Sequence, residues 1–108
     1  MLLTPFNADA TDEKTASFVK KYKEQFGETP NQFAADTYDA MYIIKTAAEK
    51  AGVTPDMSAS DICEAMKTAM TEITFDGLTG EGMTWDADGE PSKAPKAMKI
   101  VDGAYTAM

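Results

Sequence analysis

The sequence contains no histidine and only one cysteine, Cys63, among its 108 residues. Without histidine the chain cannot form a Ser-His-Asp or Cys-His nucleophile system or a His-ligated zinc site. One cysteine excludes an internal disulfide and a CxxC motif, and with no partner to activate its thiol we expect Cys63 to be buried and inert. These absences argue against an enzyme and against a metal or other cofactor.

Positive charge and long apolar runs are also scarce. The chain carries 10 lysines and arginines against 18 aspartates and glutamates, for a formal net charge of −8. Such a balance argues against binding to nucleic acid or to an anionic membrane surface, since both need clustered basic residues. No apolar run approaches the ~20 residues of a membrane-spanning helix. Hydrophobic residues make up 44% of the chain, which is typical of one globular domain.

The first predicted helix lies near the start of the chain. Phe18, Tyr22 and Phe26 recur four residues apart, so they share one helical face. Asp9 or Thr11 is expected to cap the start of this helix, because a short polar side chain can accept a hydrogen bond from a free backbone N–H there. The pattern indicates a helix that buries its aromatic face.

Two further helices are predicted after the first. The second runs from about residue 32 to residue 51, after Asn31 as its N-cap, and its apolar face is wide for a surface helix. That width implies contacts on two sides. The third runs from about residue 61 to residue 71.

The remainder of the chain favours strands and turns. Residues 75–82 contain three glycines and no helical period. Strands are expected at both ends of the chain and around the tryptophan, and Asp102-Gly103 is a strong hairpin signal. The expected strands cover residues 1–4, 83–85, 97–101 and 104–108.

Two acidic patterns invite a chemical interpretation. Asp36 and Asp39 are three residues apart on one helix, and paired carboxylates perform acid–base chemistry where their environments differ. The plainer interpretation, acids favoured by the helix dipole, is preferred. A calcium loop starting at Asp86 fails, because glycine falls at its fourth position and Ala97 stands where the loop needs glutamate.

Four stretches together resemble a known family. They are Leu2-Leu3-Thr4-Pro5-Phe6, residues 18–30, Phe-Ala-Ala-Asp-Thr-Tyr-Asp-Ala at 33–40, and residues 75–80 with the turns at 85–89 and 101–103. The third matches the pattern FAAxxYDA and is the most specific. In this order the stretches resemble the C-terminal part of type I periplasmic binding proteins, and more narrowly the branched-chain amino-acid substrate-binding subunits of ABC transporters.

The resemblance implies a fold. Members have two α/β lobes joined by three crossover strands, with ligand in the cleft between the lobes, and this sequence would supply roughly the last third. The expected class is therefore α/β, a partial Rossmann-like fragment with three helices and a β-rich C-terminal hairpin region. Residues 1–5 would form a crossover strand, 6–74 the helical part of the N-terminal lobe, 75–84 a second crossover segment, and 85–108 the β-rich part of the C-terminal lobe.

The resemblance also implies a function and a site. The parent protein would capture an amino acid or related small carboxylate and deliver it to an ABC transporter permease. Phe33 would pack against the ligand side chain and Ala35 would leave room for it. Asp36 would contact the ammonium group of the ligand. Core packing for Phe33 and a solvated helix-terminal acid for Asp36 are the alternatives. Tyr38 and Asp39 are expected to be structural.

The family is exported, which implies the periplasm or, in a monoderm cell, a surface lipoprotein. The isolated chain is not expected to bind ligand well, because most of the family's ligand-binding groups lie in parts absent from this sequence. An uncovered second helix would expose an apolar patch, so we expect the chain alone to dimerise or exchange elements between copies. The alternative function is a free-standing acidic helical module for protein–protein interaction.

Overall fold

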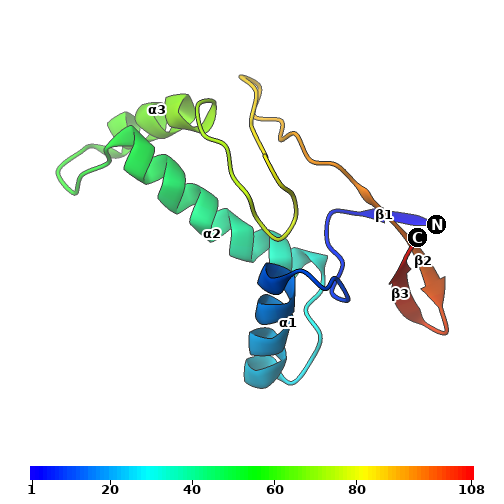
Figure 1. Ribbon diagram of the computed structural model, residues 1–108. Helices are drawn as coiled ribbons and strands as arrows, with labels where there is room; N and C mark the ends of the chain where they lie inside the picture. Colours follow the sequence, from blue (N-terminus) through cyan, green and yellow to red (C-terminus); the bar gives the residue numbers. More distant parts are fainter.

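The computed structural model describes all 108 residues and contains three helices and one three-stranded sheet (Figure 1). The predicted order of a strand, three helices and a β-rich tail is confirmed. The elements are β1 (Leu2–Thr4), α1 (Glu13–Phe26), α2 (Gln32–Ala51), α3 (Ala59–Met70), β2 (Lys96–Val101) and β3 (Ala104–Ala107).

Each helix begins after a polar side chain that accepts a backbone hydrogen bond. Asn31 accepts from the N–H of Ala34 at 3.0 Å, as predicted for α2. At α1 the cap is Asp12, which accepts from the N–H of Thr15 at 2.9 Å. The prediction of Asp9 or Thr11 was therefore wrong, because α1 begins at Glu13 and the residue in the N-cap position is Asp12. Caps of this kind fix where α1 and α2 start.

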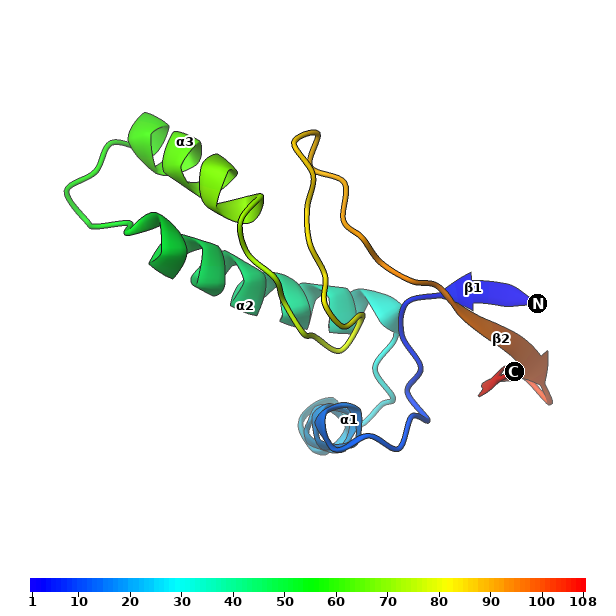
Figure 2. The same cartoon turned by 45° about the horizontal axis from the view of Figure 1, so that its top comes forward.

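The sheet is antiparallel throughout, in the order β1-β2-β3. Leu2 lies opposite Met98 in the first pair. Asp102 and Gly103 connect β2 to β3 with φ angles of 51° and 82°, and two successive positive φ values are the signature of the tight hairpin turn that the sequence predicted. Both views place the sheet at one end of the molecule, away from α3 (Figures 1 and 2).

The strand expected at residues 83–85 does not form. Only isolated bridges occur there, one between Phe75 and Met83 and one between Trp85 and Pro91. Beside the second bridge the N–H groups of Thr84 and Glu90 bond to the side chains of Ser92 and Asp86, so no further backbone pairs form there. The segment from residue 84 to residue 95 therefore runs as an irregular connection from the helices to β2 (Figure 2).

The buried core is small and lies where the loop at residues 75–83 crosses α2. Phe6, Val19, Ala35 and Leu78 form its central cluster, and α3 packs along the second half of α2 (Figure 1). Cys63 lies on α3 and is exposed. Its predicted burial was wrong, because α3 has only one neighbouring helix.

One side of α2 has no partner within the chain. Ala35, Asp39 and Ala47 on its covered side are buried, whereas Met41 and Ile44 are 64% and 54% exposed. The sequence predicted contacts on two sides, and the chain provides them on one. The molecule is correspondingly elongated, with a radius of gyration of 16.3 Å against about 13 Å for a compact chain of this length.

Candidate functional site

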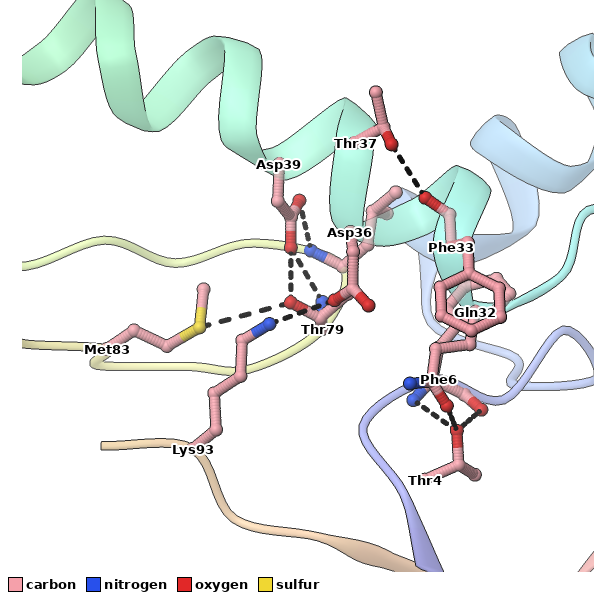
Figure 3. Close-up of polar contacts among 11 residues, drawn as sticks. Thr4, Phe6, Gln32, Phe33, Asp36, Thr37, Asp39, Thr79, Met83 and Lys93 are labelled. Carbon is pink, nitrogen blue, oxygen red and sulfur yellow. Dashed lines mark hydrogen bonds and ion pairs between the residues drawn. The ribbon is translucent and has the colours of Figure 1, made fainter. Parts of the chain in front are cut away.

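The three residues predicted to contact ligand lie in the first turns of α2 and have different surroundings; Figure 3 shows Phe33 and Asp36. Phe33 is 73% exposed. Ala35 is fully buried in the central core cluster, so its side chain contacts neighbouring residues and has no exposed surface. Asp36 is partly buried and bonded to another side chain. The structure thus brings the three residues to one end of the helix and leaves only Phe33 freely accessible.

Asp36 forms an ion pair that sequence reasoning missed. The ammonium of Lys93 lies 3.0 Å from Asp36 Oδ1, and Figure 3 shows the lysine reaching up to α2 from the irregular segment before β2. The two side chains are 27% and 33% exposed, against 52% or more in every other ion pair. The pair therefore ties the start of α2 to a segment 57 residues away. No local pattern marks such a contact.

Asp39 anchors the loop at residues 75–83 to α2. Its carboxylate is 2% exposed and accepts the N–H groups of Leu78 and Thr79, each at 2.9 Å, and the hydroxyl of Thr79 at 2.7 Å (Figure 3). A Cβ atom on Gly77 would lie 2.4 Å from Asp39 Oδ2, so only glycine allows this approach. The predicted structural role of Asp39 is confirmed.

The acid–base interpretation of Asp36 and Asp39 finds no support in these contacts. One carboxylate is bonded to Lys93 and the other to three donors of the loop. The interpretation preferred from the sequence was that the helix dipole favours the two acids. It is also incomplete, because each carboxylate bonds to specific partners. Both acids thus hold distant segments of the chain against α2.

A second polar contact fixes β1 against the same end of α2. The buried hydroxyl of Thr4 donates to Gln32 Oε1 at 2.7 Å and accepts from the N–H of Phe6 at 3.3 Å. Figure 3 shows this cluster beside Phe33. The first half of α2 is therefore hydrogen-bonded to β1 and to the loop at residues 75–83, and ion-paired to the segment that carries Lys93.

An apolar groove of about 790 Å³ lies between α1 and α2. Aromatic rings line it in contact with one another, with ring centres 4.9 Å apart for Phe18 and Tyr38 and 4.6 Å for Tyr22 and Phe26. A hydrogen bond with Tyr42, together with partial burial, raises the pKa of Tyr38. The sequence predicted the aromatic face of α1 but not a groove. The lining residues are Lys14, Ser17, Phe18, Lys21, Tyr22, Gln25, Phe26, Asn31, Phe33, Ala34, Thr37, Tyr38 and Met41.

Neither a metal cluster nor a membrane-spanning helix is found. No group of three or more acidic, cysteine or histidine side chains is placed to hold a metal ion. Each helix is too short or too polar to cross a membrane. The start of α2 presents the exposed ring of Phe33 and the carboxylate of Asp36, which is paired with Lys93.

Comparison by sequence gives one family. A family model described as periplasmic binding protein matches residues 1–104. No curated protein matches the chain.

Comparison by structure gives binding proteins of ABC transporters. A protein from Rhodospirillum rubrum, named for a branched-chain amino acid ABC transporter, is 26% identical, with 99% of this chain and 30% of that one covered and a TM-score of 0.71. A substrate-binding protein from Desulfitobacterium hafniense, solved in complex with Leu, is 21% identical over 95% and 29% of the two chains, with a TM-score of 0.75. A leucine-binding protein from Thermotoga maritima is 24% identical over 98% and 29%, with a TM-score of 0.73. The chain spans about 30% of the length of these structures.

Proposed function

The chain belongs to the periplasmic binding protein family, and we propose that it is part of an extracytoplasmic protein that captures an amino acid for an ABC transporter. The family match over residues 1–104 carries this proposal. It is supported by the similar fold of a substrate-binding protein solved with Leu and of a leucine-binding protein. Capture of this kind is binding without bond chemistry.

The start of α2 is the proposed ligand contact. Phe33, with 73% of its surface exposed, would pack against the ligand side chain. Asp36 would meet the ligand ammonium through Oδ2, because Oδ1 is bonded to Lys93. Ala35 was expected to leave room for the ligand side chain, but it is buried in the core cluster with no exposed surface, so the proposed contact rests on Phe33 and Asp36. The proposed ligand is a branched-chain amino acid or a related small carboxylate.

The proposed division of the chain follows the two regions of the structure. Residues 6–74 would belong to the N-terminal lobe and residues 85–108 to the C-terminal lobe. Residues 1–5 and 75–84 would be crossover segments. The separation of the helices from the sheet supports this division (Figure 1). Because a cleft needs both lobes, the chain alone would hold ligand only weakly.

The proposed partner is a membrane permease, and the proposed location is the periplasm or the outer surface of a monoderm cell, with a lipid anchor in the latter case. The family match supports both. A free-standing acidic interaction module is the alternative function. Its support is the exposed apolar side of α2, and the end-to-end family match weighs against it.

A nuclear magnetic resonance titration of the 108-residue chain tests the site. Leucine should shift signals around Phe33 and Asp36 weakly, without raising the melting temperature, whereas 4-methylpentanoate, which lacks the ammonium group, should leave Asp36 unshifted. The Ile100→Ala variant, whose substitution is exposed on β2 rather than on α2, is the control and should give the same leucine shifts as the wild-type chain. Shifts confined to other regions would contradict the assignment of the site.

A further inference from the structure

The backbone that carries Lys93 is held against α2 by contacts other than the ion pair with Asp36. The N–H of Ser92 donates to the carbonyl of Thr84 at 2.9 Å, and the N–H of Thr84 donates to Ser92 Oγ at 3.1 Å. Thr84 follows the loop at residues 75–83, which Asp39 anchors to α2. Lys93 therefore leaves a closed turn whose position relative to α2 is already fixed.

The side chain of Lys93 crosses that loop to reach α2 (Figure 3). A Cβ atom on Gly80 would lie 3.8 Å from Lys93 Cγ, so the aliphatic part of the lysine passes close to the loop backbone. The ammonium then bonds to Asp36 Oδ1 at 3.0 Å. Both side chains are about one-third exposed or less, so solvent screens this pair less than it screens the fully exposed pairs.

The pair places a positive charge beside the carboxylate that is proposed to contact the ligand ammonium. The nearby acid Asp39 directs its carboxylate at three donors of the loop, whereas the partner of Asp36 is a full cation. A cation on Oδ1 repels a second cation that approaches Oδ2, because like charges a few ångströms apart repel. For a zwitterion, attraction between Lys93 and the ligand carboxylate offsets this repulsion. For an amine without a carboxylate, nothing offsets it.

We propose that Lys93 determines specificity by making the site select amino acids over amines that carry the same side chain; this rests on the proposed capture of an amino acid at Asp36. Lys93 fixes Oδ1, leaves Oδ2 to the ligand, and offsets the charge of the carboxylate. The same groups from the rest of a longer protein would surround the site with and without the lysine charge. A comparison of variants at position 93 therefore isolates the effect of that charge.

Nuclear magnetic resonance titrations of the 108-residue chain with leucine and with leucinol test the proposal at pH 7. Leucinol has the same side chain and ammonium group but a hydroxymethyl group in place of the carboxylate. Lys93→Met keeps the aliphatic part of the lysine and removes the charge, so it should raise the affinity for leucinol relative to leucine about tenfold. Lys93→Gln, which keeps a donor for Oδ1 without the charge, should give the same change. Lys93→Arg keeps the charge and should retain the wild-type ratio.

Lys45→Met is the matched control, because Lys45 is also an ion-paired lysine but lies about 14 Å along α2 from Asp36, beyond the Debye length of about 8–10 Å. It should leave the ratio of the two affinities unchanged, and circular dichroism confirms that each variant is folded.

Two outcomes would overturn the role of Lys93 alone. They are an equal change for both ligands in Lys93→Met, which would mean that the lysine only supports the fold, and a wild-type ratio in Lys93→Gln. A wild-type chain in which neither ligand shifts Phe33 or Asp36 would instead contradict the proposed function, and this inference with it.

Discussion

The carboxylate of Asp39 accepts both the backbone N–H and the hydroxyl of Thr79, which lies 40 residues further along the chain. The same carboxylate also accepts the N–H of Leu78. This group is almost entirely shielded from solvent, because Asp39 is 2% exposed and Thr79 fully buried. One side chain of α2 therefore organises the loop that closes the small core.

Replacing Asp39 with alanine should destabilise the chain by about 3 kcal/mol, because two buried N–H groups and one hydroxyl would lose their acceptor. Urea unfolding followed by circular dichroism measures the change. Asp88→Ala is the control, since Asp88 is exposed in a turn and its side chain makes no hydrogen bond. Equal stability of the two variants would contradict the anchoring role of Asp39.

Gly77→Ala should destabilise the chain by about 2 kcal/mol or more, because the added Cβ would overlap the Asp39 carboxylate at 2.4 Å and the loop would have to move. The test is a double-mutant cycle. In an Asp39→Ala background the overlap is gone, so the cost of Gly77→Ala should fall sharply. A cost that is the same in both backgrounds would show that the glycine is needed for another reason.

Asp12 makes the stability of α1 depend on pH. The N–H of Thr15 bonds to its carboxylate and lowers the pKa of Asp12 below its usual range. A carboxyl group with a lowered folded-state pKa stabilises the fold above its unfolded pKa of about 3.9, and this stabilisation is lost as the pH falls through the folded value.

The control for this pH effect is Asp12→Asn, because asparagine keeps the N-cap hydrogen bond and does not titrate. The difference in urea midpoint between wild type and variant should be constant at neutral pH and should change below about pH 4. Parallel curves for the two proteins down to the lowest pH would contradict the prediction.

The ion pair between Asp36 and Lys93 should contribute a small but measurable coupling free energy to the stability of the fold. A double-mutant cycle with Asp36→Asn and Lys93→Met should give about 0.5–1 kcal/mol, since both side chains are about one-third exposed. The pair of Lys45 and Glu49, at 64% exposure on each side, is the control and should give less. A larger coupling for the control would mean that the partly buried pair does not tie the two segments together.

Local signals in the sequence predicted the elements well. Asn31 caps α2 as expected, because a cap depends on residues only a few positions away. The prediction for Cys63 failed because burial depends on neighbouring elements, and α3 has only α2 beside it.

The site was predictable only in part. The motif that contains Phe33 and Asp36 identified the start of α2, and the structural role given to Asp39 is confirmed by its three bonds. Lys93 was not predicted, because it lies in an irregular segment and its contact with Asp36 spans 57 residues. The groove was missed for the same reason, since it depends on how α1 and α2 pack.

Binding by a chimera tests the central claim most directly. The matching 29% of the Desulfitobacterium hafniense protein solved with Leu would be replaced by this chain, and leucine binding would be measured by calorimetry. The account predicts that a folded chimera binds leucine, that Phe33→Ala and Asp36→Asn each weaken binding at least tenfold, and that Ile100→Ala does not. A folded chimera that binds no amino acid, or one indifferent to both substitutions at the start of α2, would contradict it.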